Sequence, residues 1–339
     1  MNDAGLRSKD AEDLKLDTTL RPVCFTEFVG QRKIVDNLKL YIQAAKKRNE
    51  ALDHVLLSGL PGLGKTTLAC LITKELNSSL VSTSGPALEK PGDLAGLLSN
   101  LKKNDVLFID EIHRIPTVVE EHLYSAIEDF HINIVLNEGM KARPLQIKLE
   151  PFTLIGATTR EGLLSDAFRA RFGVIEKLQI YPPEDLLEII KRSAKILGVK
   201  IDEAGAVVIA ERSRGTPRIA NRFLRRIRDL AQVKSNNLIS EETAKEGMAR
   251  MGVDFAGLDN TDRKILQTII RSGCVVGLKT IAISVGEEED TIEEVFEPYL
   301  IQTGFMIKTP KGRKATELAY KHLNEKLPAN YRKENGLWD

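Results

Sequence analysis

A glycine-rich stretch between an apolar run and a helical pattern constrains this chain most. Residues 59–66 read GLPGLGKT, which matches the pattern GxxxxGK[ST]. An apolar run, residues 55–57, precedes the stretch, and apolar residues at helical spacing follow it. Glycines let backbone N–H groups turn inward around a phosphate, and the start of the following helix adds positive potential. The order strand, loop, helix therefore predicts a phosphate-binding loop in an α/β fold.

Two side chains of this loop carry predicted chemistry. Lys65 is expected to reach the terminal phosphates of a nucleotide, and Thr66 offers a hydroxyl to Mg²⁺. Gly62 and Gly64 provide the turn of the backbone. The alternative is an ordinary glycine-rich turn between a strand and a helix, but the complete pattern in this context favours nucleotide binding.

An acidic pair follows the next buried strand. Residues 106–109 are continuously apolar and end in Asp110 and Glu111. A parallel strand of this kind delivers its carboxylates to the sheet edge where the phosphate loop also lies. We expect Asp110 to hold Mg²⁺ through water and Glu111 to act as the general base that orients a water toward the γ-phosphate. The alternative is a surface acidic pair at the end of a strand.

Further polar residues could complete this site. A third apolar strand ends in Thr158, which could lie between the attacking water and the γ-phosphate or could occupy a turn. Arg169 and Arg171 lie between aromatic residues; either could reach the nucleotide of a neighbouring subunit as an arginine finger, or form a structural salt bridge. Arg218 begins a helix directly after a proline and can point back over the nucleotide.

Composition bounds the class of protein. The chain has 339 residues, of which 42% are hydrophobic and 29% charged, with a net charge of +1. These values predict a globular protein of two or three domains and exclude wholesale disorder. Cys24, Cys70 and Cys274 are too far apart in sequence to indicate a metal cluster or a redox pair. Acidic residues near the start and the absence of a long apolar run predict a cytoplasmic protein that does not enter the membrane.

Patterning along the chain predicts four segments. Residues 1–19 are polar and are expected to form a flexible leader. Residues 20–181 alternate strands with helices, which is typical of a parallel sheet with crossover helices. Residues 182–254 follow a wholly helical pattern. Residues 255–339 begin with short helices and continue into a strand and a turn, as in a winged helix.

Residues 131–150 are predicted to form an inserted β-hairpin. Apolar residues alternate with polar ones on both sides of a short segment that contains a glycine. An exposed apolar hairpin commonly meets a partner, and the alternative is that the hairpin packs onto its own domain.

Charge is segregated within the last domain. Residues 284–297 carry seven acids and no base, whereas residues 306–333 carry eight bases and two acids. An acidic helix cannot lie in a DNA major groove without strong repulsion, so base reading by a recognition helix is not expected. The basic turn with Lys311 and Arg313 is the expected contact, gripping phosphates or the minor groove without sequence preference. The alternative is a solvated lysine-rich turn.

Taken together, these motifs resemble those of AAA+ ATPases. Longer motifs resemble the RuvB family, the bacterial motors that move Holliday junctions. They are LFIDEIHR at 107–114, IGATTR at 155–160, RGTPRIANR at 214–222 and EPYLIQTGF at 297–305. The resemblance extends over residues 20–320 or so and implies an AAA+ P-loop domain with a parallel sheet, a small helical lid and a C-terminal winged helix domain.

The resemblance also implies an activity and a set of partners. It implies a homohexameric ring around duplex DNA that uses ATP with Mg²⁺ to pull a four-way junction through, in recombination and repair. RuvA is the implied partner that loads the ring and contacts the 131–150 hairpin, and RuvC is a further expected partner. The implied nucleotide contacts are Leu20, Arg21 and Tyr181 around the adenine, Gly62, Gly64, Lys65, Thr66 and Thr67 at the phosphates, Glu128, Asp129 and Phe130 beside the nucleotide, Arg171 as the finger given in trans, and Arg218 as the lid sensor.

A second class of function uses the same phosphate loop. In a nucleotide-gated switch, such as a clamp-loader-like module, ATP assembles a complex and hydrolysis resets it, whereas a motor consumes ATP continuously on DNA. A protein-remodelling AAA+ is disfavoured because no aromatic pore loop is evident. The chain departs from the RuvB pattern at Leu60, where proline is usual, at Lys311, where arginine is frequent, and in residues 271–277, which are shorter than in typical relatives.

Overall fold

A computed structural model describes residues 19–136 and 143–328 of the chain. The expected leader, except for its last residue, and the turn of the inserted hairpin lie outside the described residues. The chain divides into two compact units. The first consists of residues 1–196 and 215–221, and the second of residues 197–214 and 222–339.

A five-stranded parallel sheet forms the centre of the first unit, with the strand order β2-β3-β6-β1-β7. The strands are β1 (Val55–Ser58), β2 (Leu80–Ser84), β3 (Val106–Asp110), β6 (Thr153–Thr158) and β7 (Val174–Lys177). This sheet confirms the predicted fold class. β6 lies between β1 and β3. The carboxyl ends of three strands are therefore neighbours: β1, which precedes the phosphate loop, β3, which leads into the acidic pair, and β6, which ends in Thr158.

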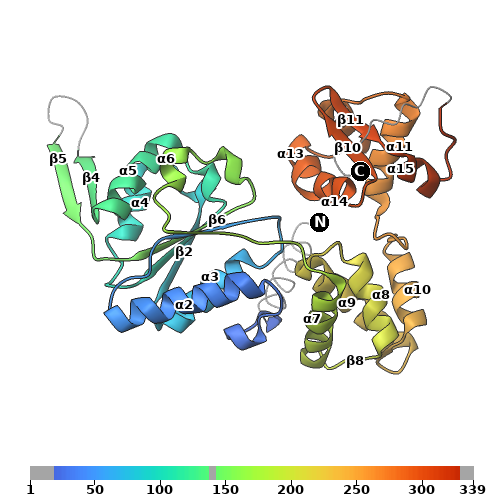
Figure 1. The fold of residues 1–339 in the computed structure, drawn as a ribbon, viewed down its shortest axis with the longest axis horizontal. Coiled ribbons are helices and arrows are strands. Elements are labelled where there is room, and N and C mark those ends of the chain that lie inside the picture. Colours follow the sequence, from blue (N-terminus) through green and yellow to red (C-terminus); the bar gives the residue numbers. More distant parts are fainter. Residues whose placement is uncertain (1–18, 137–142, 329–339) are drawn as a thin grey trace, which may run out of the picture. The chain divides into compact units, whose positions relative to one another are not determined.

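Helices cover the sheet, with α2 and α3 on one side and α4 and α5 on the other (Figure 1). The helices of this unit are α2 (Arg32–Arg48), α3 (Lys65–Leu76), α4 (Pro91–Leu98), α5 (Thr117–Glu128), α6 (Asp166–Arg169) and α7 (Pro183–Ile196), with 3₁₀ turns at Phe25–Glu27, Gly85–Ala87, Ile112–Arg114 and Glu161–Leu163. Apolar side chains of α4, α5, β3 and β6 form one buried cluster. This packing holds β3, the strand that leads into the acidic pair, in its place in the sheet.

The inserted hairpin consists of β4 (His131–Leu136) and β5 (Arg143–Lys148), an antiparallel pair in which His131 faces Lys148. It forms a sheet of its own, separate from the five-stranded sheet (Figure 1). Ile132 at its base is fully buried in the core of the first unit, whereas Leu145 is exposed. The base of the hairpin thus packs on its own domain, and the exposure increases away from it.

The second unit contains helical and winged portions. Its elements are β8 (Lys200–Ile201), α8 (Glu203–Arg212), α9 (Pro217–Lys234, whose first turn belongs to the first unit), β9 (Leu238–Ile239), α10 (Glu241–Arg250), α11 (Asn260–Ser272), α12 (Leu278–Val285), α13 (Glu289–Thr291), a π-helical turn (Ile292–Phe296), α14 (Glu297–Gln302), β10 (Met306–Thr309), β11 (Gly312–Ala315) and α15 (Glu317–His322). β10 and β11 pair antiparallel around a tight turn and form the wing. None of the described helices is long and apolar enough to cross a bilayer.

Candidate nucleotide-binding and catalytic site

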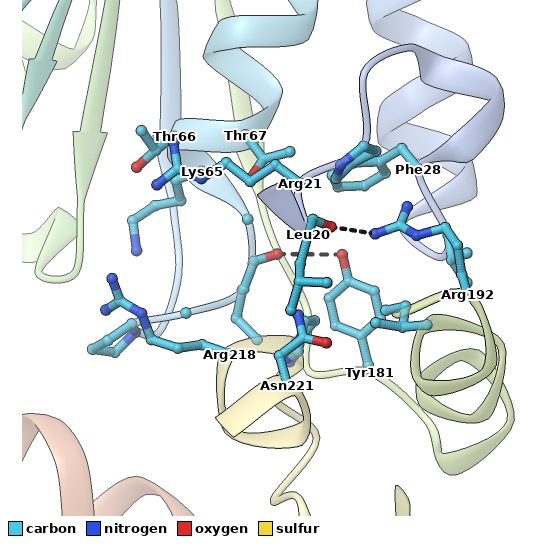
Figure 2. A pocket seen from close by; sticks show the side chains of 18 of the residues that line it. Leu20, Arg21, Phe28, Lys65, Thr66, Thr67, Tyr181, Arg192, Arg218 and Asn221 are labelled. Carbon is cyan, nitrogen blue, oxygen red and sulfur yellow. Dashed lines mark hydrogen bonds between the residues drawn. The ribbon is translucent and has the colours of Figure 1, made fainter. Parts of the chain in front are cut away.

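A pocket in the first unit brings most of the predicted site residues together. It lies over the phosphate loop, between the segment that begins at Leu20 and the first turn of α9 (Figure 2). Its lining includes Leu20, Arg21, Gly62, Gly64, Lys65, Thr66, Thr67, Asp110, Glu111, Tyr181 and Arg218 as predicted, and also Pro22, Phe28, Val29, Pro61, Leu63, Ile189, Arg192, Pro217 and Asn221.

Glycines shape the phosphate end of this pocket. Gly62 and Gly64 have φ values of +81° and +108°, in the region that favours glycine. A Cβ atom on Gly62 would lie 2.8 Å from Thr216 Cγ2 and 2.9 Å from Arg218 Cβ, so a larger residue would displace the first turn of α9. Lys65 Nζ donates to the Gly59 carbonyl oxygen at 2.7 Å, which holds the ammonium group inside the loop.

Glu111 adopts a left-handed backbone conformation with φ of +49° at the end of β3. A residue with a Cβ atom rarely adopts this backbone conformation, and backbone strain of this kind is concentrated at functional sites. Gly85 makes room for it, because a Cβ atom on Gly85 would lie 2.3 Å from the Glu111 carbonyl oxygen. The Glu111 carboxylate accepts a hydrogen bond from Thr159 Oγ1 at 3.2 Å.

Thr158 lies apart from the described lining of the pocket. Its side chain is fully buried, and its hydroxyl pairs with His113 Nδ1 at 2.9 Å and accepts the Arg160 backbone N–H at 3.0 Å. Thr159 is also not among the described lining residues, but its hydroxyl is the one that reaches Glu111, because consecutive side chains along an extended chain point to opposite faces. Our sequence analysis missed Thr159, although the adjacent threonines in ATTR were the signal.

A buried aromatic ring and a buried arginine shape the other end of the pocket (Figure 2). Tyr181 is 4% exposed and its hydroxyl donates to the Leu63 carbonyl oxygen at 3.2 Å. Arg192 of α7 donates to the carbonyl oxygens of Leu20 at 2.8 Å and Glu27 at 2.6 Å. Burial raises the pKa of Tyr181 and lowers the pKa of Arg192. No sequence motif pointed to Arg192, because its role depends on packing against a segment far away in the sequence.

The first turn of α9 supplies the last wall of the pocket. The Tyr181 backbone N–H donates to the Gly215 carbonyl oxygen at 2.9 Å, which ties the turn before α9 to the end of the sheet domain. In the view of Figure 2, Lys65 and Arg218 lie toward one end of the pocket and Leu20, Tyr181 and Arg192 toward the other. The pocket thus has cationic side chains over the phosphate loop at one end, and at the other the apolar surface of Leu20 and Tyr181 beside an arginine that is bonded to backbone carbonyl oxygens. This arrangement suits a nucleotide.

Comparisons with known proteins match this architecture over nearly the whole chain. The family model described as the Holliday junction DNA helicase RuvB P-loop domain matches residues 20–178, the RuvB AAA lid domain matches 181–254, and the RuvB C-terminal winged helix domain matches 256–324. The chain belongs to the RuvB family. The resemblance seen in the sequence is therefore confirmed, together with the P-loop, lid and winged helix composition of the fold.

Individual RuvB relatives agree with this assignment. The Holliday junction branch migration complex subunit RuvB of Chlorobaculum parvum is 55% identical over 317 residues, which is 93% of each chain. The protein of the same description from Kosmotoga olearia is 52% identical and covers 100% of this chain and 99% of its own. The solved structure of the Thermotoga maritima RuvB Holliday junction branch migration motor superposes with a TM-score of 0.84 at 51% identity, covering 91% of this chain and 100% of that one.

Four residues that the RuvB resemblance placed beside a nucleotide lie elsewhere in the first unit. Glu128, Asp129, Phe130 and Arg171 are not among the described residues that line the pocket. Instead, Arg171 Nε lies 3.2 Å from Glu128 Oε1, and the Arg171 guanidinium stacks 4.3 Å from the centre of the Tyr124 ring. The Glu128 side chain is 52% exposed, so this group is accessible from outside the protomer.

Arg313, one of the two predicted DNA contacts of the wing, is paired within its own domain. Arg313 is only 8% exposed. Its Nε donates to Glu297 Oε1 at 2.5 Å, and a terminal nitrogen donates to Glu293 Oε1 at 3.1 Å. Burial alone would lower the pKa of Arg313, but the two carboxylates raise it. The guanidinium is therefore engaged within the domain, while Lys311 at the tip of the wing is exposed. The acidic and basic halves of this domain neutralise each other here, which sequence segregation alone did not reveal.

Proposed function

We propose that this chain is an ATP-hydrolysing motor that translocates duplex DNA and branch-migrates Holliday junctions in recombination and repair. The observation that carries the proposal is one pocket that unites a phosphate loop, the Asp110–Glu111 pair and a lid arginine, in a chain that continues into a winged helix. The relatives named above as branch migration complex subunits support the same substrate. Because that substrate is chromosomal DNA, we place the motor in the cytoplasm.

The residues of the pocket fit ATP with Mg²⁺. The glycine backbone and Lys65 suit the phosphates, and the Thr66 hydroxyl and the Asp110 carboxylate are oxygen ligands of the kind that Mg²⁺ prefers. The described residues contain no cluster of three or more acidic, histidine or cysteine side chains that could hold a metal alone, so phosphate oxygens and water would complete the coordination. A bound Mg²⁺ would neutralise charge on the transferred phosphoryl group.

Four side chains would then divide the work of hydrolysis. Glu111 orients and deprotonates the attacking water, and Thr159 fixes the direction of the Glu111 carboxylate through its hydrogen bond. Lys65 exchanges its loop carbonyl partners for phosphate oxygens. Arg218 at the start of α9 approaches the terminal phosphate from the lid side, so that binding of the nucleotide can move α9.

A homohexameric ring would supply what a single protomer lacks. Arg171 and the Glu128–Phe130 segment lie together near the surface, apart from the pocket of their own chain. We assign them to the nucleotide of the neighbouring protomer, where Arg171 acts as the arginine finger. Arg169 is the weaker candidate under the RuvB resemblance, and its guanidinium is paired with Asp166.

Partners and DNA would contact other parts of the chain. We assign the hairpin of β4 and β5 to RuvA, because it forms a separate sheet with exposed apolar surface such as Leu145. RuvC is a further proposed partner. The exposed Lys311 is the proposed phosphate contact of the wing, while Arg313 holds the wing against the acidic helix.

Steady-state ATP hydrolysis, with and without RuvA and a synthetic four-way junction, tests the proposal when strand products are scored in the same samples. Glu111→Gln is the blank that retains nucleotide binding, and Lys65→Ala is the blank that loses it. A motor hydrolyses ATP continuously and converts the junction into two duplexes. ATP turnover without strand products, or turnover indifferent to DNA, would contradict the motor and support the nucleotide-gated switch.

A further inference from the structure

Two buried polar atoms on residues that line the nucleotide pocket have no hydrogen-bond partner among the described residues, Arg192 Nε and Asn221 Oδ1. Arg192 is nevertheless held through its two terminal nitrogens, which donate to the carbonyl oxygens of Glu27 and Leu20. Asn221 Oδ1 is the acceptor of the two, and Asn221 lines the pocket from the first turn of α9.

An amide oxygen that is buried without a donor is rare in folded proteins, because its desolvation is not compensated. Such an oxygen in a ligand pocket is explained when the ligand brings the donor. Asn221 lies three residues after Arg218 on the same helical face, about 4.5 Å further along the helix axis.

The position within the pocket indicates which part of the nucleotide meets this oxygen. In the view of Figure 2, Arg218 is directed toward the side of Lys65, whereas Asn221 is drawn on the side of Leu20 and Tyr181. Those two residues are both nearly fully buried and give that side of the pocket apolar surface. Phosphate oxygens are acceptors and cannot satisfy an amide oxygen, so within ATP the donor groups are on the nucleoside.

We propose that the Asn221 amide oxygen accepts a hydrogen bond from the nucleoside of bound ATP and thereby selects the nucleotide. The inference rests on the ATP site proposed above. The shared chemistry is an N–H or O–H donor, which the 6-amine of adenine and the 2′-hydroxyl of ribose both offer. In the first case Asn221 discriminates against guanine, whose keto oxygen at that position is an acceptor; in the second it discriminates against deoxynucleotides.

Equilibrium binding of three nucleotides to the full-length protein tests this contact and identifies the donor. The nucleotides are ATP, purine riboside triphosphate, which lacks the 6-amine, and 2′-deoxyATP. Each is titrated against the wild type, against Asn221→Leu, and against Asn100→Leu as the matched control at an exposed asparagine. Thermal unfolding of each variant shows that the fold is retained.

We expect Asn221→Leu to bind ATP about three- to tenfold more weakly than the wild type, with Asn100→Leu unchanged. Removal of the donor should weaken binding to the wild type but not to Asn221→Leu, and the analogue that shows this coupling names the donor. Equal ATP affinity of Asn221→Leu and the wild type, or losses that add for both analogues, would overturn the proposal. Failure of every protein to bind ATP would instead overturn the proposed function.

Discussion

At the scale of single residues, two adjacent threonines have different surroundings: one is placed to position a proposed catalytic side chain, and the other packs inside the domain. Thr159 bonds the Glu111 carboxylate at 3.2 Å, whereas Thr158 is buried against His113. We expect Thr159→Val to lower kcat for ATP hydrolysis by about tenfold or more while the Kd for ATP stays unchanged, because the general base loses its orientation. Thr158→Val should instead cost about 1 kcal/mol of stability. A larger loss of kcat in Thr158→Val than in Thr159→Val would return the catalytic role to Thr158.

The same pair of threonines shows which features of single residues could be predicted from the sequence. Residue types and order predicted the phosphate loop, the acidic pair and a threonine at the end of the third strand, because each requirement is local. Which of Thr158 and Thr159 faces Glu111 depends on where β6 ends and how the chain turns after it. Arg192 had no local signal at all, since its partners are backbone carbonyl oxygens of Leu20 and Glu27.

At the scale of elements, the 3₁₀ turn at Gly85–Ala87 supports the corner that carries Glu111. We expect Gly85→Ala to lower kcat and to reduce stability, because its Cβ atom would lie 2.3 Å from the Glu111 carbonyl oxygen. Gly96→Ala on α4 is the matched control: no heavy atom lies within 4 Å of its Cβ position, so it should gain roughly 0.5–1 kcal/mol. Steady-state kinetics and thermal unfolding of both variants check this, and an unaffected Gly85→Ala enzyme would show that the corner can shift freely.

The cap of α11 predicts a dependence of stability on pH. Burial and the neighbouring Asp259 raise the pKa of Asp262 to about 7, despite the ion pair with Arg214. The folded state therefore binds more protons than the unfolded state between the ordinary pKa of 3.8 and about 7, so stability falls as pH rises through this window. Asp262→Asn removes this titration. The Tm difference between wild type and Asp262→Asn should thus favour the wild type more at about pH 5 than at about pH 8. The reverse trend would mean that Arg214 keeps Asp262 ionised throughout.

Two cations of the wing, Lys311 and Arg313, lead to a further electrostatic prediction. We expect Lys311→Ala to weaken DNA binding equally for all sequences and to reduce the salt slope by about one unit. Arg313→Ala should cost about 3–5 kcal/mol of stability, since it leaves the buried Glu297 carboxylate without its partner. Salt-dependent DNA titrations and unfolding experiments separate the two effects. If Arg313→Ala instead retained its stability and reduced the salt dependence of DNA binding, Arg313 would again be the phosphate contact.

The wing also shows what the charge pattern leaves out at the element scale. The acidic residues 284–297 and the basic residues 306–333 are separate in sequence, and this separation favoured the basic turn as the DNA contact. In the structure Glu293 and Glu297 meet Lys308 and Arg313 across the wing. Such pairing is a property of tertiary contact, so the sequence could predict the winged helix but not which of its cations remain available to DNA.

At the scale of the whole molecule, the proposed arginine finger lies apart from the pocket of its own chain. The described lining of the pocket includes the phosphate loop, Glu111 and Arg218, while Arg171 is bound to Glu128 elsewhere in the same unit. If Arg171 serves the neighbouring pocket, activity is a property of the contact between protomers. Arg171→Ala should then lower kcat about 10³-fold while ATP binding to the loop is retained.

Mixing two inactive variants tests that assignment. Arg171→Ala protomers keep an intact pocket, and Lys65→Ala protomers keep an intact Arg171. In a mixed ring, a Lys65→Ala protomer can present its Arg171 to the pocket of an Arg171→Ala neighbour, so hydrolysis should rise above the sum of the two separate activities. The gain should be largest near equal mixing, where such neighbours are most frequent. If Arg171 acted on the nucleotide of its own chain, no mixture could contain a complete site, and the activity would stay at that sum at every ratio.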